Sequence, residues 1–225
     1  MPLTPLQHDS YYGELNEVLH AYAGLVADDT PERPSEALAA CMRHTWPTRP
    51  HAPAAAGAQL RPYARTPPGP PRRRLGEFCP VPDVGPYEDA VRDWLLLLAD
   101  HLHRSNEAGE VPPPGSPRTH WEWHARFPEL GQMLGGWFSQ DMPDESEDHD
   151  AALQDYLDTT DRSLVTRLAG ELHELLALGL DEGGYVVGLT ELGLEVDPPD
   201  SFSHGSWLVA LAQAVLAAGD TGRQE

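Results

Sequence analysis

The stretch FPELGQMLGGWFSQDMPDESEDHDAALQDYL, residues 127–157, decides the fold that we predict for this chain. It starts as an amphipathic segment, reaches a Gly-Gly pair followed by Trp137 and Phe138, and ends in a run of acids. The spacing of the apolar residues predicts a helix over 127–138, interrupted by the glycines, and a short helix over 148–157. The stretch therefore predicts two helices joined by an acidic loop.

Helical spacing of apolar residues continues on both sides of this stretch. Asp161 can cap a long helix, and a last helix begins near Ser203 and is closed by Gly219. Upstream, residues 8–45 are periodic as well, with Ser35 as an N-cap inside them. The segment GYVVGLTELGLEV is ambiguous, because its valines favour a strand while LTELG favours a helix end. No alternating apolar–polar run is long enough to predict a sheet, so the predicted class is all-α or nearly so, built of helical bundle modules.

Changes in composition predict the domain boundaries. Residues 1–46 together with the helix at 87–105 form an expected N-terminal helical unit. Residues 47–86 are crowded with proline and are expected to be an irregular, partly extended linker or insertion. Residues 106–124 are expected to be a second linker, followed by a helical domain over 125–219. The arginines of the first linker could belong to a nucleic-acid-binding tail, but in so acidic a chain a solvated linker on the protein's own acidic face is favoured. They are Arg61, Arg65, Arg72, Arg73 and Arg74.

Two segments of the chain align without gaps, YYGELNEVLHAYAG at 11–24 and RFPELGQMLGGWFS at 126–139. The similarity continues to Ala-Leu at 37–38 and 152–153. Two amphipathic helices share such patterns easily, so both a chance likeness and a duplication with a degenerate first copy stay open. The matched residues are Glu14 with Glu129, Leu15 with Leu130, Val18 with Met133, Leu19 with Leu134 and Tyr22 with Trp137.

Composition limits the partners of the protein. The 225 residues include 36 acids against 15 bases, all of them arginine, for a net charge of -21. Such a surface repels nucleic acid and anionic membranes and attracts basic partners. The N-terminus does not resemble a signal peptide, and the longest apolar run, WLLLLA, is far shorter than the ~20 residues that span a bilayer. We therefore expect a cytoplasmic protein in which Cys41 and Cys79 are unpaired thiols.

Motifs of enzymes are scarce. The chain has no GxSxG, P-loop or GxGxxG pattern, and abundant carboxylates carry little information in so acidic a sequence. His120 and His124 have the i, i+4 spacing of a helical metal pair, and with Glu122 they suggest a distant alternative, a metal-dependent hydrolase. The glutamate stands in the wrong place for the HExxH pattern. We expect no enzyme activity, no cofactor and no metal.

The acidic run is the best candidate for a binding site. Residues 139–161 contain nine acids and no arginine. The run is either a solvated face that keeps the protein soluble, or a surface where aromatic anchors ringed by acids bind a basic partner. In the second interpretation the aromatics themselves either fill a cleft of the partner or pack in the core. The candidate partner-binding residues are Trp137, Phe138, Gln140, Asp141, Asp144, Glu145, Glu147, Asp148 and Asp150.

The run from Leu134 to Asp141 resembles the opening motif of bacterial contact-dependent growth inhibition immunity proteins. In that family a helix ends in Leu, Gly-Gly, an aromatic and Phe, followed by Gln-Asp, and this chain has LGGWFSQD. The segment LGLEVDPPDSFSHGSWL, residues 192–208, resembles the closing motif of the family. The likeness covers about 126–218 and departs from the pattern at Ser139, where histidine is expected, and at Met142, where an aromatic is common.

The resemblance implies an immunity protein that binds the toxin domain of a delivered effector stoichiometrically and blocks it inside the producing cell. Many such toxins are nucleases, whose basic substrate sites an acidic surface can plug, so the implied partner is a basic protein toxin rather than nucleic acid or membrane. The main alternative is an acidic adaptor or regulatory domain that binds a basic protein without any toxin.

Overall fold

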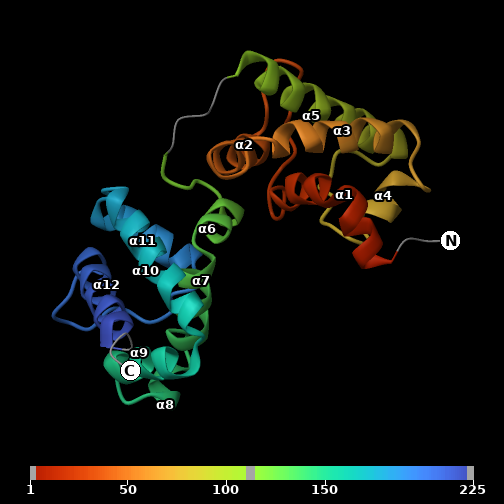
Figure 1. Cartoon of the computed structure of the whole chain (residues 1–225). Coiled ribbons are helices and arrows are strands. Elements are labelled where there is room, and N and C mark those ends of the chain that lie inside the picture. Colours follow the sequence, from red (N-terminus) through yellow and green to blue (C-terminus); the bar gives the residue numbers. More distant parts are fainter. Residues whose placement is uncertain (1–3, 110–114, 222–225) are drawn as a thin grey trace. The chain divides into compact units, whose positions relative to one another are not determined.

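The computed structural model describes residues 4–109 and 115–221, with side chains up to Ala218, and within these ranges the chain forms twelve helices and no strand (Figure 1). The all-α prediction is confirmed. The chain divides into two compact units, residues 1–122 and 123–225, which we call unit 1 and unit 2. Each unit has a hydrophobic core of its own.

Unit 1 is built from five helices, with α3 at the centre of their packing. The long helix α5 lies alongside α3 (Figure 1), α1 and α2 pack on other parts of α3, and the short α4 packs on α5. The α1 helix is kinked at Tyr12, whose backbone leaves the helical region (φ -132°, ψ 22°). The bounds are α1 Pro5–His20, α2 Glu36–Thr48, α3 Ala52–Arg65, α4 Pro71–Leu75 and α5 Glu88–Ala108.

The structure corrects the expectation that residues 47–86 form an irregular linker. Most of this segment is helical, and α3 places Leu60 and Tyr63 in the core of unit 1. Pro53 lies in the first turn of α3, where the lack of a backbone N–H costs little stability. The residues that follow are rich in alanine, the amino acid with the highest helix propensity. Three arginines of the segment bond within the unit, since Arg61 pairs with Asp100 at 3.1 Å, Arg74 pairs with Glu77 at 3.0 Å, and the Arg72 guanidinium donates to the Gly85 carbonyl oxygen. The expected linker at 106–124 includes residues 110–114, which lie outside the described ranges.

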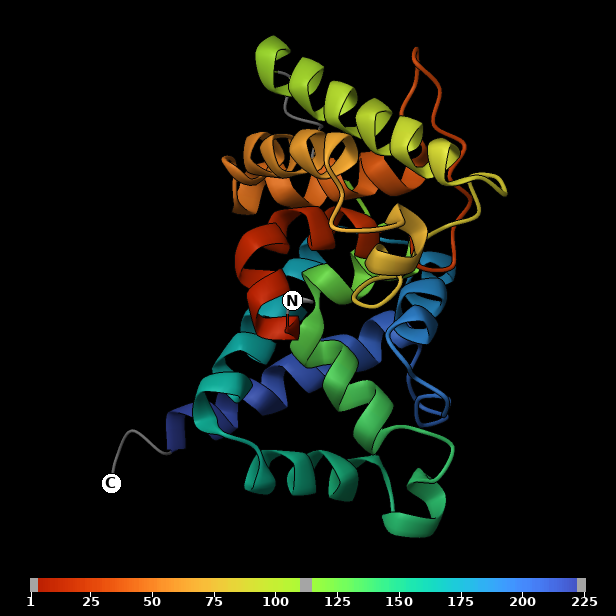
Figure 2. The same cartoon turned by 90° about the vertical axis from the view of Figure 1, so that its right-hand side faces the viewer.

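Unit 2 contains α7 Pro128–Trp137, α8 Met142–Glu145, α9 His149–Thr159, α10 Arg162–Ala177, α11 Glu182–Glu191 and α12 His204–Thr221, and α6, His120–Arg126, spans the boundary between the units. The α10 helix packs mainly against α12 and α7, while α9 packs against α7 and α11 against α12. Figure 2 shows α9 lying across the end of α7, with α8 in the connection between them.

Several local predictions in unit 2 are confirmed and two are wrong. Asp161 caps α10 as predicted, accepting a hydrogen bond from the Ser163 amide. The predicted short helix at 148–157 is α9, and its N-cap Asp148 accepts from the Ala151 amide. The predicted interruption at the glycines is wrong, because α7 runs on to Trp137. Gly219 does not close the last helix, since α12 continues to Thr221.

The ambiguous segment at 184–196 forms most of helix α11 and the turn that ends it. A glycine inside this helix is needed for close packing, because a Cβ on Gly188 would lie 2.5 Å from the indole of Trp123. Gly193 ends the helix at φ +97°, and a Cβ there would lie 3.1 Å from Gly135 of α7. Both glycines let buried segments approach closely, and the packing that this allows offsets the low helix propensity of the glycines and valines in α11.

Both cysteines are buried, unpaired thiols in the core of unit 1, as predicted. Burial raises the pKa of Cys41 and of Cys79 to about 12, so neither side chain is a reactive thiolate near neutral pH. None of the described helices combines the length and the apolar character required to cross a membrane.

Candidate functional site

Trp137 lies at the end of α7, where the helix reaches the surface of unit 2. Its side chain is half-buried, and its ring packs edge-on against Tyr156 of α9 with centroids 5.0 Å apart. Its indole Nε1 donates a hydrogen bond of 2.8 Å to Asp155 Oδ2. Trp137 is therefore held in one orientation with part of its ring still open to solvent.

The start of α7 is fixed as well. The backbone amides of Glu129 and Leu130 donate to the carboxylate of Glu171 on α10, at 3.3 and 2.8 Å. These bonds satisfy donors that the first turn of a helix leaves unpaired. Burial raises the pKa of the Glu171 carboxyl, and the two amide hydrogen bonds oppose that rise. Because α7 is anchored at this end, the position of Trp137 at its other end is defined by rigid elements.

An open groove of about 520 Å³ lies beside Trp137. Its walls come from the end of α7, the α8–α9 connection and the exposed face of α9. The groove joins one aromatic side chain to three carboxylates, a combination that suits a guanidinium or ammonium group. The lining residues are Gly136, Trp137, Glu145, Ser146, Glu147, Ala151 and Asp155.

Phe138 is a core residue, and its expected place in the binding surface is corrected. Its side chain is fully buried and packs edge-on against Trp207 of α12, with centroids 5.3 Å apart. Its ring also lies 5.9 Å from that of His149. The two neighbouring aromatics therefore have different roles. The Trp137 side chain lines the groove, and the Phe138 side chain packs the end of α7 against the core.

The remaining predicted residues are all exposed, but the structure gives them different positions. Glu145 and Glu147 line the groove, whereas Gln140, Asp141, Asp144, Asp148 and Asp150 do not. The Gln140 amide donates to Glu195 Oε2 at 2.9 Å, and the Asp148 carboxylate is occupied in capping α9. The acids predicted to bind a partner thus form a rim of negative charge, and of these only Glu145 and Glu147 line the groove.

Asp155 is a groove residue that sequence reasoning left out of the binding set. It belongs to the acidic run but lies beyond the predicted loop, on the exposed face of α9. Ala151 and Asp155 are four residues apart and so share one face of the helix, next to buried positions at Ala152 and Tyr156. Helical phase within the short predicted helix was the signal that could have identified it.

The histidine pair of α6 does not form a metal centre in the structure. His124 Nε2 lies 2.8 Å from the carbonyl oxygen of Glu191, so that this ring nitrogen is engaged with the backbone. Glu122 accepts hydrogen bonds from Arg43 at 3.1 and 2.9 Å. Among the described residues, no group of three histidine, cysteine or acidic side chains is placed to hold a metal ion. The geometry therefore gives no support to a metal-dependent hydrolase.

Comparison with protein families identifies one match, over residues 126–215, to the family described as CdiI immunity protein. The matched segment begins at the end of α6 and ends inside α12, so it contains the whole groove. Comparisons with curated proteins and with solved structures give no match. Members of the matched family are generally inhibitors without enzyme activity, and the family implies neutralisation of a cognate contact-dependent growth inhibition toxin.

Proposed function

We propose, from the premise that residues 126–215 form a CdiI immunity protein domain, that the groove beside Trp137 binds the cognate toxin domain. The chain would act in the cytoplasm of the cell that makes the toxin, as a stoichiometric inhibitor that turns nothing over. The observation that carries the proposal is the position of the groove, which combines an immobilised indole with carboxylates from two neighbouring segments.

The chemistry of the groove favours a basic side chain of the toxin as its occupant. A guanidinium group placed over the Trp137 ring gains a cation–π attraction, and Glu145, Glu147 and Asp155 supply acceptors for its donors. The exposed acids around the groove extend the negative field beyond contact distance and raise the rate of association with a basic protein. Unit 2 as a whole favours such a partner, because residues 123–225 carry 20 acids and four arginines, a net charge of -16.

We infer that a nuclease toxin is the best fit to this surface. Nuclease substrate sites are basic because they hold phosphate, and a groove rimmed by carboxylates can occupy such a site in place of nucleic acid. An immunity protein of this kind would block the toxin by covering its substrate site.

Charge reversal in the groove tests this function. The probe is a purified, basic C-terminal domain of a contact-dependent toxin, and the association rate is measured at low and at high salt. The variant Glu145→Arg with Glu147→Arg is expected to slow association at least ~10-fold at low salt, with a smaller effect at high salt. Its stability should change by only about 0.5 kcal/mol, since both side chains are exposed.

A matched control is Asp93→Arg with Glu107→Arg, two exposed acids of α5 in unit 1, which changes the net charge by the same amount. If the two double variants slow association equally, the effect comes from net charge and the groove is not the binding site. If the toxin does not bind the wild-type chain and a basic host protein does, the adaptor function replaces the immunity function.

A further inference from the structure

The helices of unit 1 repeat those of unit 2 in order and in packing. In unit 1, α3 packs mainly on α5 and α1, and in unit 2 α10 packs mainly on α12 and α7. Two of the smaller contacts correspond too, since α2 packs on α1 as α9 does on α7, and α4 packs on α5 as α11 does on α12. The packing of α2 on α3 has no counterpart of similar extent between α9 and α10. This agreement extends far beyond the short sequence likeness of the first helices.

The kink in α1 is the most specific part of the correspondence. Residue 12, at the kink, aligns with Phe127, the residue where the chain breaks between α6 and α7. The backbone angles are close, at φ -132° and ψ 22° for Tyr12 and φ -129° and ψ 57° for Phe127. In both units the residue four positions earlier is a buried ring that packs against this aromatic, His8 at 5.1 Å and Trp123 at 5.8 Å.

The buried positions of corresponding helices in the two units also match along the length of each helix. The α3 helix ends at Arg65 and α10 at Ala177, and aligning these ends superposes their buried positions. The same holds for α5 and α12 when Ala108 is aligned with Thr221. The matched buried pairs include Ala56 with Leu168, Leu60 with Leu172, Tyr63 with Leu175, Trp94 with Trp207, Leu95 with Leu208, Leu98 with Leu211, Ala99 with Ala212 and Leu102 with Val215.

We propose that residues 5–108 are a second copy of the immunity domain, and that this copy binds a different toxin domain, one without a strongly basic surface. The proposal rests on the function proposed for unit 2. What it adds to that function is a second immunity domain in the same chain, with a different toxin specificity.

The groove of unit 2 has no open counterpart in unit 1. Gly136 and Asp155, which are exposed in the groove, align with Ala21 and Ala40, and both alanines are fully buried. Half-buried Trp137 aligns with Tyr22, which is only 1% exposed. Unit 1 therefore lacks both the opening and the acceptor carboxylate through which unit 2 would take a basic side chain.

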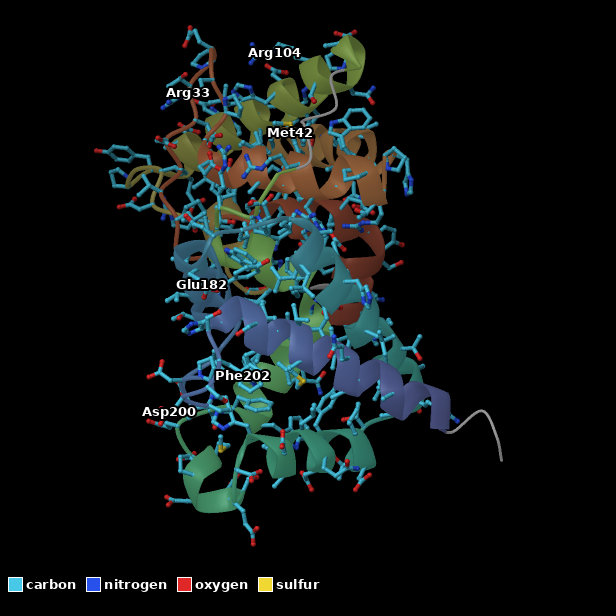
Figure 3. The ribbon with its side chains drawn as sticks, turned by 90° about the vertical axis from the view of Figure 1, so that its left-hand side faces the viewer. Arg33, Met42, Arg104, Glu182, Asp200 and Phe202 are labelled. Carbon is cyan, nitrogen blue, oxygen red and sulfur yellow. The ribbon has the colours of Figure 1, made fainter. Side chains whose placement is uncertain are left out.

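Hydrogen bonds from α5, and from Tyr22 within the connection itself, hold the connection between α1 and α2 in place. Trp94 Nε1 and the Tyr22 hydroxyl donate to the carboxylate of Asp29, at 3.1 and 2.8 Å. His101 Nε2 donates to the Thr30 carbonyl oxygen at 2.7 Å, and Arg104 Nη2 donates to the Pro31 carbonyl oxygen at 2.7 Å. Figure 3 shows Arg104 at the same end of unit 1 as Arg33, which belongs to this connection.

The corresponding positions in unit 2 cannot make these bonds. His101 and Arg104 align with Ala214 and Ala217, whose methyl side chains have no donor. Neither position can therefore donate a side-chain hydrogen bond to the connection between α7 and α9. In that connection, Glu145 and Ser146 line the groove. The two copies differ at the place where the proposed recognition occurs, while their cores agree.

The surface of unit 1 favours a partner of another kind. Residues 1–122 carry 16 acids and 11 arginines, a net charge of -5 against -16 for unit 2. The most exposed large apolar side chains of the described residues also lie in unit 1, at Leu6, Tyr11, Val26 and Tyr87. An interface of this composition depends on apolar contact more than on long-range attraction.

Two single substitutions, each of which disables one unit, test the proposal in cells. The full chain is produced together with each member of a panel of contact-dependent toxin C-terminal domains, chosen to range from strongly basic to near-neutral. Leu95→Asp disables unit 1 and Leu208→Asp disables unit 2, because both leucines are fully buried at equivalent positions. We expect Leu208→Asp to lose protection against the basic toxin and keep it against a near-neutral one, and Leu95→Asp to do the opposite.

Two further measurements separate loss of binding from unfolding and give the binding stoichiometry. The groove variant Glu145→Arg with Glu147→Arg must behave like Leu208→Asp without unfolding unit 2. Native mass spectrometry of the wild-type chain must show one copy of the basic toxin per chain. Two copies per chain, or a panel in which no near-neutral toxin depends on unit 1, would overturn the proposal. Failure of the wild-type chain to bind any basic toxin would instead count against the function proposed for unit 2.

Discussion

Unit 1 and unit 2 place buried residues at the same helical positions and differ in what surrounds them. Their cores match in pairs such as Leu19 with Leu134, both fully buried, while their net charges are -5 and -16. The connection after the first helix is strapped down in unit 1 and borders an open groove in unit 2. The two units therefore share a pattern of buried helical positions, whereas a few side chains around the connection after the first helix distinguish the unit that has the groove from the unit that lacks it.

Truncating the matched core leucines should have the largest effect. Leu19→Ala and Leu134→Ala are each expected to cost about 2–5 kcal/mol of unfolding free energy, from lost burial and the cavity left behind. Both cysteines lie in unit 1, so the rate of thiol labelling reports the opening of that unit. Labelling should accelerate strongly for Leu19→Ala and hardly for Leu134→Ala. Equal acceleration would show that the two cores unfold together.

Removing the Trp137 side chain from the groove should weaken binding of the basic toxin by about 2 kcal/mol, which raises the dissociation constant roughly 30-fold. Trp137→Ala removes the ring, and Trp137→Phe keeps the packing on Tyr156 while losing the hydrogen bond to Asp155. The matched change in unit 1, Tyr22→Phe, should leave toxin affinity as it is. Titration calorimetry checks this, and an equal loss from Tyr22→Phe would place the basic toxin on unit 1.

Removing the caps of the second helix should cost about 1 kcal/mol in either unit. Ser35 accepts from the Leu38 amide at the start of α2, and Asp148 accepts from the Ala151 amide at the start of α9. We expect Ser35→Ala and Asp148→Ala to have similar costs in chemical denaturation, because the two helices correspond. A negligible cost for Asp148→Ala would indicate that its carboxylate is free for partner binding.

The smallest effect is a pH dependence confined to unit 1. Burial lowers the pKa of His8 below its ordinary value, although Asp9 opposes this, so the folded unit holds a neutral imidazole. The unfolded chain takes up a proton more readily, and the contribution of His8 to stability is therefore lost as pH falls below about 6.5. Thiol labelling should accelerate between pH 7.5 and 5.5, after correction for thiolate content, and His8→Phe should reduce that change. An unchanged pH dependence in His8→Phe would assign it to another group.

Periodicity and capping residues in the sequence predicted most of the helices. Ser35, Asp148 and Asp161 are caps in the structure because their short side chains satisfy first-turn amides wherever a helix follows. Proline misled the prediction in unit 1, since Pro53 lies in a first turn where it favours the helix. The amphipathic pattern of α3 was hidden by the small residues on its buried face.

The site was predicted in part. Composition and the family motif pointed to the correct segment, and Trp137, Glu145 and Glu147 do line the groove. Sequence could not separate the two aromatics, because the burial of Phe138 depends on Trp207, far along the chain. Helical phase could have placed Asp155 on the exposed face of the short predicted helix, but its position beside Trp137 depends on how α9 packs against α7.

Hydrogen exchange of the full chain, with and without the basic toxin domain, tests the central claim most directly. We predict that the toxin slows exchange in residues 136–155, around the groove, and leaves residues 21–40 of unit 1 unchanged. Slower exchange in residues 21–40, or an unchanged groove under saturating toxin, would contradict the claim that only the second copy of this fold opens to a basic toxin.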